Sequence, residues 1–525
     1  MTFSQWLVFI LVIQVIHFLA TFKLYQRAGR KAWEAIVPIY NAVILMKIIN
    51  RPWWWVLLLF VPIINLVMIP VIWVETIRSF GKNSTKETWL VVLTLGFYIF
   101  YVSYVTNDAY IKDRSLKPKN VLGEWTNSIV FAVVAATFVH IYIMQPFVIP
   151  SSSLEKTLLV GDLLFVSKFH YGARVPMTMV SAPFVHDTLP LVKLKSYLFD
   201  DRYEERNTSI WNKFQLPYMR LPGLQDIARN DIVVFNQPAD TLLDMNDFHP
   251  DRNYYKPIDK KTNLVKRCVA IAGDSLEIRE GYVYINGKRT VLPERAKPQY
   301  IFKVDTDGQQ IPYEMLVERY GYREGGFNGK EYTLVLTDKE AELIKSHPAV
   351  KSVTKMLTPK GVKDAVFPYI DSLDWNMDNF GPIYIPKKGD ELKITRANLP
   401  FYKRLIAEYE NNNLSVAGDD IYINGKQTDT YTVKQNYYWM MGDNRHRSLD
   451  ARKWGYVPFD HVVGKPVFIW MSYESNASGI KNKIRWDRLF TTVGGDGQPK
   501  SYFWYAVVVG VLLYFGSKFY KKKKG

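Results

Sequence analysis

Long hydrophobic runs lie at both ends of the chain, and mixed polar sequence lies between them. Four N-terminal runs are almost continuously apolar, at residues 6–22, 53–74, 89–105 and 128–144. Each is close to the roughly 17–25 residues that a helix needs to cross about 30 Å of hydrocarbon. Trp and Tyr residues flank the runs, as they do at membrane interfaces. We therefore predict four membrane helices, the second kinked or re-entrant because Pro62, Asn65 and Pro70 interrupt it.

The C-terminal run, residues 502–520, is followed by four lysines. Its uninterrupted part, 502–516, is short for a spanning helix, although the long side chain of Lys518 could reach the interface. We predict a fifth membrane crossing here, with an interfacial or aggregation-prone tail as the alternative. No positive charge precedes the first run, so we interpret that run as a retained anchor and not as a cleaved signal peptide.

Basic residues are distributed unevenly among the short loops between the runs. Six lie between the first and second runs, three between the second and third, and four between the third and fourth. Cytoplasmic loops carry the excess of Lys and Arg, so the first and third loops are predicted to be cytoplasmic. The chain after Met144 is then outside the cytoplasm, and the predicted C-terminal crossing returns the lysine tail to the cytoplasm. Part of the net charge of +17 comes from the loops that are predicted to be cytoplasmic. The charge therefore does not indicate a nucleic-acid partner.

The middle of the chain, from about residue 147 to 500, contains short β-branched and aromatic runs that are typical of strands. We predict strands at residues 232–235, 276–278, 282–285, 332–336, 421–423 and 467–470. The sequence Tyr-Ile-Asn-Gly-Lys occurs twice, at 284–288 and 422–426. Asn-Gly favours a type I′ turn because both central residues take a positive φ. Each copy therefore predicts the tip of a hairpin.

Helical signals are few in this middle region. Residues 338–346 and 399–410 are candidates, the second with Asn398 as a possible N-cap. Both lie in an α+β insert between the two hairpins. The predicted divisions are a membrane module (1–124), a membrane helix (125–146), a β domain in two parts (147–288 and 421–500), the insert (289–420) and a C-terminal membrane helix (501–525).

Length and composition limit the possible classes of protein. A chain of 525 residues is too long for one simple module. With 48% hydrophobic and 22% charged residues it cannot be mainly disordered. Cys268 is the single cysteine, which excludes an intramolecular disulfide and a cysteine-based zinc cluster.

A serine-rich block follows the fourth apolar run and contains Ser151, Ser152 and Ser153. Ser152 and Glu155 fit an S-x-x-E capping box, so a linker with a helix start is one interpretation. The other interpretation is a catalytic serine. A serine hydroxyl is a poor nucleophile without a neighbouring base, and none of the eight histidines lies in a recognisable triad motif.

Lys266 and Arg267 begin a second block and lead into an apolar run that ends in Gly273-Asp274. Burial disfavours the ammonium form and can lower a lysine pKa by about 3–5 units. Such a lysine can act as a general base near neutral pH. A solvated charge at the end of a strand is the alternative.

A third block begins with the turn sequence Gly442-Asp443-Asn444-Arg445. Further charged and polar residues follow at Ser448, Asp450, Arg452 and Trp454-Gly455. The alternating charges predict a network of ion pairs. A surface loop held by salt bridges is the alternative interpretation.

The three blocks together closely resemble the type I signal peptidases (leader peptidases) of bacteria. Their order, their amino-acid sequences and their position after a membrane helix are similar to those of the family's PSxSM…PTL…GD…VxK, KRxxxxxGD and GDNRxxSxDSRxWG motifs. The resemblance covers residues 145–168, 229–287 and 421–472. It implies a signal-peptidase-like antiparallel β catalytic domain. About the first 80 residues resemble a small membrane module found fused to other bacterial membrane proteins.

By this resemblance Ser153 is the nucleophile and Lys266 the general base. The amide of Ser153 and the hydroxyl of Ser151 form the oxyanion hole, and Ser448 orients the lysine amine. Supporting ion pairs are implied for Asp443, Asp450, Arg452 and Arg267. No metal or cofactor is implied.

The sequence departs from the family pattern at several positions. Leu154 replaces a methionine of similar volume, and Lys156-Thr157 stands where Pro-Thr is common. The third block differs at His446, Arg447 and Ala451. None of these changes removes a group that the chemistry needs.

The resemblance also implies partners and location. The expected substrates are secretory preproteins with small residues before the cleavage point, and the other partners are the lipid bilayer and the secretion machinery. The expected location is the bacterial cytoplasmic membrane, multi-pass, with the catalytic domain outside. One alternative is a non-catalytic membrane scaffold that retains the ectodomain for binding. Another is a relative of the self-cleaving SOS repressors, which lack membrane helices and carry DNA-binding modules.

Overall fold

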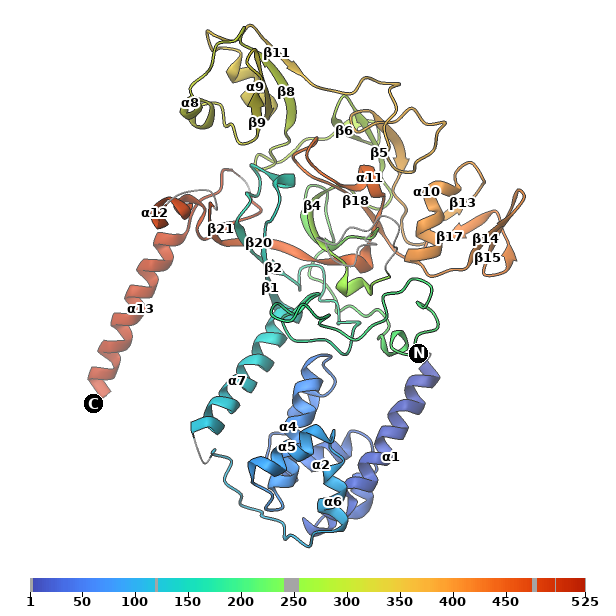
Figure 1. Cartoon of the computed structure of the whole chain (residues 1–525), viewed down its shortest axis with the longest axis vertical. Helices are drawn as coiled ribbons and strands as arrows, with labels where there is room; N and C mark the ends of the chain where they lie inside the picture. Colours follow the sequence, from blue (N-terminus) through green and yellow to red (C-terminus); the bar gives the residue numbers. More distant parts are fainter. Residues whose placement is uncertain (1–2, 119–120, 240–254, 475–478, 496, 525) are drawn as a thin grey trace. The chain divides into compact units, whose positions relative to one another are not determined.

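The computed structural model describes the chain except for residues 1–2, 119–120, 240–254, 475–478, 496 and 525. The chain forms two compact units. The helical unit contains the described residues of 1–143, 174–220 and 241–260. The β unit contains the described residues of 144–173, 221–240 and 261–525. Figure 1 labels the elements of both units along the chain.

The helical unit is built from apolar helices of very different length. They are α1 (Phe3–Arg27), α2 (Tyr40–Ile48), α3 (Trp55–Leu58), α4 (Ile64–Arg78), α5 (Thr85–Leu93), α6 (Tyr98–Tyr104) and α7 (Val121–Phe138), which continues as one π-helical turn (Val139–Ile143). Leu24, Ile44, Val91 and Val102 belong to one buried core of this unit.

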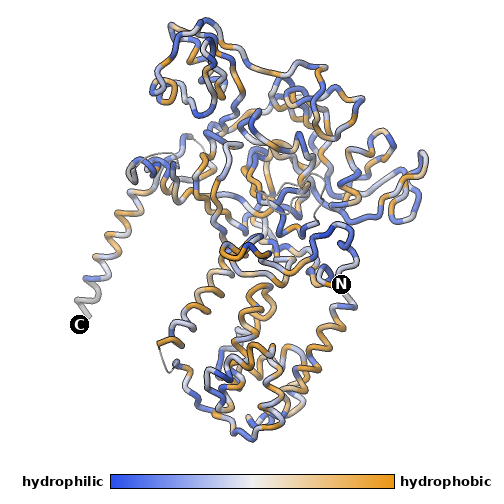
Figure 2. The backbone as a smooth tube through the Cα atoms, in the orientation of Figure 1, coloured by the Kyte–Doolittle hydropathy of each residue, from blue (hydrophilic) through white to orange (hydrophobic). Residues whose placement is uncertain are grey.

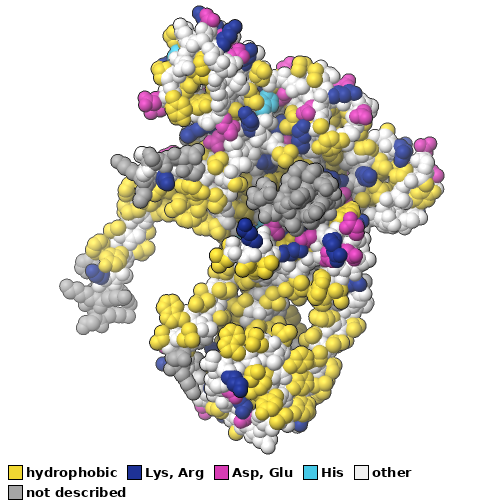
Figure 3. Space-filling view, in the orientation of Figure 1, with side chains coloured by type: hydrophobic (Ala, Val, Ile, Leu, Met, Phe, Trp, Pro, Cys, Tyr) yellow, Lys and Arg dark blue, Asp and Glu magenta, His cyan; other side chains and the backbone are white. Residues whose placement is uncertain are grey.

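Two helices of the described chain are long and apolar enough to cross a membrane, Ser4–Arg27 and Val121–Ile143. Both are strongly hydrophobic in Figure 2. In α1 the apolar side chains of Leu7, Val8 and Leu11 are exposed, and Figure 3 shows such side chains on its surface. This pattern suits a hydrocarbon environment and not water.

The predicted second and third spans are not continuous helices. The second run is divided between α3 and α4, as its prolines indicate. The third forms α5 and α6, which are bent by 116° and count as one span only if taken together. Leu95 and Gly96 between them both have positive φ, 50° and 86°, which ends the first helix. The expected four N-terminal crossings are therefore not confirmed.

The C-terminal run forms α13 (Phe503–Lys524). Its apolar part, Phe503–Lys518, is shorter than the two spanning candidates. The fifth crossing is likewise not confirmed. A short helix, α12 (Ile480–Lys483), lies earlier in the chain.

The β unit is organised around an eight-stranded sheet in the order β1-β2-β20-β3-β4-β18-β19, with β21 paired to β20. Its strands are β1 (Met144–Val148), β2 (Asp162–Ser167), β3 (Ile232–Asn236), β4 (Asn263–Ala270), β18 (Tyr437–Met441), β19 (Val457–Pro458), β20 (Val462–Ser472) and β21 (Thr491–Thr492). Neighbouring strands are antiparallel throughout. The mainly β, antiparallel architecture is confirmed.

Strand β3 shows why this sheet is stable. Val233 and Phe235 pack into one hydrophobic core, and Ile232 and Val234 pack into another. Successive side chains of a strand point to opposite faces, so the middle of the sheet is covered on both sides. On the neighbouring strand β4 the last five residues are buried as well.

Two smaller sheets contain the predicted hairpins. The first has the order β12-β5-β6-β7 and the second β14-β15-β16. Their strands are β5 (Ser275–Arg279), β6 (Tyr282–Ile285), β7 (Lys288–Arg289), β12 (Phe380–Tyr384), β14 (Leu414–Ala417), β15 (Asp420–Ile423) and β16 (Lys426–Gln427). The Asn286-Gly287 and Asn424-Gly425 turns have positive φ at both residues. Both hairpin tips are confirmed, and so are the six predicted strands.

A separate four-stranded sheet, in the order β11-β8-β10-β9, lies inside the predicted insert. With its helices it forms the part that we call the β8–β11 module, residues 300–355. The module contains β8 (Tyr300–Asp305), α8 (Tyr313–Glu318), β9 (Gly325–Phe327), β10 (Glu331–Leu336), α9 (Asp338–Ile344) and β11 (Ser352–Lys355). It has its own hydrophobic core, with Phe302, Leu316 and Ile344 among its members.

The second predicted helix of the insert is α10 (Leu399–Arg404), which continues as a π-helical turn (Leu405–Tyr409). It lies between β13 (Glu391–Lys393) and β17 (Thr430–Thr432), which pair with each other. Asn398 is at the N-cap position, but its side chain makes no capping bond. Its amide instead donates to the carbonyl of Lys393 at 2.8 Å. The predicted N-cap position is therefore confirmed, but the side chain does not cap the helix.

Candidate active site

The serine-rich block forms a tight turn between β1 and β2, and we call residues 151–157 the Ser153 turn. Ser152–Leu154 make a single 3₁₀ turn, and Glu155 leaves it with φ −47° and ψ 148°. Neither Ser151 nor Ser152 caps a helix here, so the capping-box interpretation is wrong. Ser151 is exposed, whereas Ser153 is buried, with 8% of its surface accessible.

Lys266 comes from β4, where it pairs with Val233 in the middle of the sheet. Its side-chain amine donates a hydrogen bond to the hydroxyl of Ser153, with 2.6 Å between Nζ and Oγ. Only 4% of Lys266 is exposed. Burial lowers the pKa of Lys266 to about 8, although the carboxylates of Asp450 and Asp443 act in the opposite direction. A serine hydroxyl and an amine with a lowered pKa therefore lie in direct contact.

An ion pair at the end of β18 joins all three sequence blocks. The guanidinium of Arg267 binds both carboxylate oxygens of Asp443, at 2.8 and 2.6 Å. Thr157 of the Ser153 turn donates to the same carboxylate at 2.7 Å. Although burial alone would raise the pKa of Asp443, the charge of Arg267 holds it below its ordinary value. The buried carboxylate is thus charged and fully paired.

A second buried pair supports the loop that follows. Arg452 binds both oxygens of Asp450, each at 2.9 Å. Asp450 also accepts from the backbone amide of Gly442 at 3.0 Å, and Arg452 donates to the carbonyl of Arg445 at 2.6 Å. These contacts close the loop of the third block upon itself.

Gly442 allows the third block to approach Ser153. A Cβ atom at this position would lie 2.3 Å from Oγ of Ser448 and 2.5 Å from the carbonyl oxygen of Ser153. Ser448 is buried, and its hydroxyl has no hydrogen-bond partner within the described part of the chain. Its predicted role in orienting Lys266 stays a prediction.

The contacts of two residues, Asn444 with the Ser153 turn and Gln299 with the third block, were not foreseen from the sequence. The backbone amide of Asn444 donates to the carbonyl of Ser153 at 3.0 Å, and its side-chain amide donates to the carbonyl of Ser152 at 3.2 Å. The backbone of Gln299 donates to Asp443 and accepts from Arg445, at 2.8 and 2.9 Å. Asn444 stands in a recognised turn motif, but no pattern marks Gln299.

His446 is one of the positions that differ from the family pattern. Its Nδ1 accepts from the backbone amide of Ile301 at 3.1 Å, and its Nε2 lies 2.8 Å from a carboxylate oxygen of Asp378. Leu154, another such position, is buried in an apolar core. Both departures are accommodated by packing.

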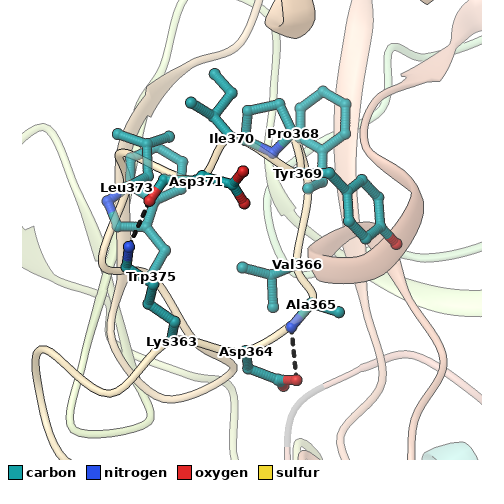
Figure 4. A pocket seen from close by; sticks show the side chains of 11 residues that line it. Lys363, Asp364, Ala365, Val366, Pro368, Tyr369, Ile370, Asp371, Leu373 and Trp375 are labelled. Carbon is teal, nitrogen blue, oxygen red and sulfur yellow. Dashed lines mark hydrogen bonds between the residues drawn. The ribbon is translucent and has the colours of Figure 1, made fainter.

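A pocket of about 430 Å³ lies elsewhere in the β unit, lined by Lys363–Ile370, Asp371, Leu373 and Trp375 (Figure 4). None of the predicted site residues lines it. Its wall is joined to the third block through the amide of Phe367, which donates to the carbonyl of Arg452 at 2.9 Å. Ser153 and Lys266 do not line this pocket.

A match to a known protein family identifies the family of this chain. The family described as "Signal peptidase, peptidase S26" matches residues 122–318 and 385–471, which include the three blocks. The chain belongs to this family. It is therefore a serine endopeptidase of the S26 family, and the resemblance seen in the motifs is confirmed. Residues 33–113 match a family of unknown function (DUF5684).

Individual relatives agree with the family match. Signal peptidase I of Haemophilus influenzae is 25% identical over 384 residues, 72% of this chain and 78% of the relative. Signal peptidase I of Helicobacter pylori is 23% identical over 386 residues, 70% and 92% of the two chains. That of Aquifex aeolicus is 23% identical over 340 residues, 65% and 80%. Residues 319–384, which include α9, lie outside the family match.

Proposed function

We propose that this S26 peptidase is a membrane-bound signal peptidase that removes signal peptides from exported preproteins with Ser153 as nucleophile and Lys266 as general base. The observation that carries the proposal is the 2.6 Å contact between the lysine amine and the serine hydroxyl. The lowered pKa of Lys266 supports it, because a base must be neutral to accept a proton. The relatives' name, signal peptidase I, supports the choice of substrate.

The mechanism that we propose has two halves. The hydroxyl oxygen of Ser153 attacks the scissile carbonyl while the amine of Lys266 takes its proton. The amide of Ser153 and the hydroxyl of Ser151 stabilise the developing oxyanion, an effect of about 3–4 kcal/mol per donor in other proteases. The lysine ammonium then protonates the leaving amine. In the second half, Lys266 takes a proton from water, which hydrolyses the acyl-enzyme and regenerates the serine.

The membrane arrangement that we propose has an even number of crossings before β1. The loop charges favour a cytoplasmic position for the segments after α1 and before α7. If α1 and α7 span and the intervening helices do not, both the N-terminus and the β unit lie outside the cytoplasm, as they do with four crossings. Ser153 follows Met144 by only nine residues, about 30 Å of extended chain. A substrate that leaves the bilayer could be cleaved at its surface.

A cleavage assay on the full-length chain tests the proposal. The purified protein is incubated in detergent with a preprotein that carries Ala-x-Ala before the cleavage point, and the mature product is measured. We expect Ser153→Ala and Lys266→Met to abolish cleavage. A scaffold protein without catalytic activity would bind the preprotein and yield no product with the unmodified chain.

The chain contains a matched control for these substitutions. In the helical unit, Nζ of Lys260 donates to Oγ of Ser181, also at 2.6 Å, and both residues are buried. Burial lowers the pKa of Lys260 as well. This second pair lies outside the three sequence blocks. Ser181→Ala should therefore keep cleavage near its original rate, and loss of cleavage in this variant but not in Ser153→Ala would reject the assignment.

A further inference from the structure

The backbone at Lys156 is unusual for the Ser153 turn. Lys156 has φ 68°, a left-handed conformation that is strained for a residue with a side chain. A proline cannot take this conformation because its ring holds φ near −65°. The Ser153 turn therefore follows a path that the commoner Pro-Thr sequence does not allow. Such a conformation persists only where surrounding contacts hold it.

The contact that holds Lys156 comes from α9. Its amine lies 2.5 Å from the carboxylate of Glu340, and the two side chains are only 10% and 23% exposed. The carboxylate is itself fixed, because the same oxygen accepts from the backbone amide of Thr337 at 2.7 Å. Gly321 lies against its other oxygen, so closely that a Cβ there would come within 2.3 Å. The ion pair thus ties a strained residue to a rigid helix start.

A second carboxylate of the β8–β11 module acts through Asn444. Glu324 accepts from the side-chain amide of Asn444 at 2.9 Å. The same amide nitrogen donates to the carbonyl of Ser152. That carbonyl shares a planar trans peptide with the amide of Ser153, so the two groups point in opposite directions. Fixing the carbonyl of Ser152 therefore fixes the direction in which the Ser153 amide points.

We propose that Glu324 and Glu340 are positioning residues for the Ser153 turn: Glu324 aims the amide of Ser153 through Asn444, and Glu340 holds the left-handed backbone at Lys156. Both carboxylates belong to residues 319–384, outside the family match. A part of the chain that is not shared with the family thus completes the geometry of its catalytic turn. The inference rests on the proposed function, since it assigns the Ser153 amide as an oxyanion donor.

Glu324 is tested by comparing Glu324→Ala with Glu324→Gln in the preprotein assay on the full-length chain. Glutamine keeps a carbonyl oxygen that can accept from Asn444, whereas alanine does not. We expect alanine to lower kcat by about tenfold to a hundredfold, as a displaced catalytic group does, with KM nearly unchanged. Glutamine should keep kcat within about threefold of the original, because the acceptor is retained.

Glu340 is tested by a rescue experiment. Glu340→Gln should lower kcat by about tenfold or more, because the buried ammonium of Lys156 loses its counter-charge and the turn shifts. In the double variant Lys156→Gly/Glu340→Gln the buried charge is gone, and glycine takes a positive φ without strain. We expect this double variant to recover most of the lost kcat. Lys345→Met, which breaks the exposed Glu342–Lys345 pair on α9, is the matched control and should leave kcat unchanged.

The outcomes separate this inference from the proposed function. If the unmodified chain cleaves and Ser153→Ala does not, the proposed function stands, and unchanged kcat in Glu324→Ala or Glu340→Gln overturns the inference alone. Equal losses in Glu324→Ala and Glu324→Gln, or no recovery in the double variant, also overturn it. Thermal unfolding is measured on every variant. If kcat falls only in variants whose β unit is unfolded at the assay temperature, the two residues are structural and the inference is wrong.

Discussion

Cleavage by this peptidase should increase with pH through a midpoint near 8. The perturbation is a change in the protonation of Lys266, whose pKa is lowered to about 8 by burial. Only the neutral amine can take the proton of Ser153. The rate should therefore be low at pH 6, rise about tenfold per pH unit below the midpoint and level off above it.

The lowered pKa of Lys266 determines what fraction of the molecules has a neutral amine at a given pH. With a pKa of about 8, roughly one molecule in ten has a neutral Lys266 at pH 7, whereas the ordinary value of 10.5 would leave about one in 3,000. Burial thus increases the population of active base about 300-fold. The same shift corresponds to about 3 kcal/mol, by which the buried ammonium is less stable than an exposed one.

The assay is a pH–rate profile of kcat/KM, which reports the pKa of the free enzyme. It is measured on the unmodified chain and on single substitutions of the eight histidines. A midpoint near 6.5 that disappears in one histidine variant would show that a histidine is the base, and the reasoning from Lys266 would be refuted. A profile without any rise between pH 6 and 9 would refute it equally.

The free energy of unfolding provides an independent check of the lowered pKa of Lys266. Because the folded-state pKa is below the unfolded one, the unfolded chain binds more protons between about pH 8 and 10.5. The contribution of Lys266 to the free energy of unfolding therefore rises with pH across this window. Lys266→Met should be more stable than the original at pH 7, and the difference should shrink toward pH 10 in urea unfolding.

Two further predictions concern residues around Ser153, and a third concerns the side of the membrane on which the β unit lies. Gly442→Ala should reduce kcat by more than a hundredfold, because its Cβ would lie 2.3 Å from Oγ of Ser448 and 2.5 Å from the carbonyl oxygen of Ser153; normal cleavage by this variant would contradict the geometry. Arg267→Met should lower the free energy of unfolding by about 3–5 kcal/mol, since it leaves the buried carboxylate of Asp443 unpaired, and Arg267→Met/Asp443→Leu should recover part of the loss in urea unfolding. Protease added to intact spheroplasts should digest the β unit; protection until lysis would place it in the cytoplasm.

Features that depend on neighbouring residues could be predicted from the sequence. The Asn-Gly turns of the two hairpins need a positive φ at both residues, and this requirement is local. The strand at 232–235 is visible as a short β-branched run, since both of its faces are buried. Ser153 and Lys266 could be proposed as a pair because each stands in a block whose sequence is specific to one family, and the structure places their side chains in contact.

The tertiary structure alone decided which distant residues complete the site. Gln299, Glu324 and Glu340 lie in no recognisable motif. Glu340 contacts the Ser153 turn directly, and Glu324 acts on it through Asn444, because the β8–β11 module folds against this part of the β unit. The 116° bend between α5 and α6 likewise depends on two positive φ values inside an apolar run, where hydrophobicity alone predicts a continuous helix. The hydrophobic pattern and the sequence motifs predict local conformation and local chemistry. Packing between segments far apart in the chain depends on the whole fold, and it determines how the Ser153 turn is held.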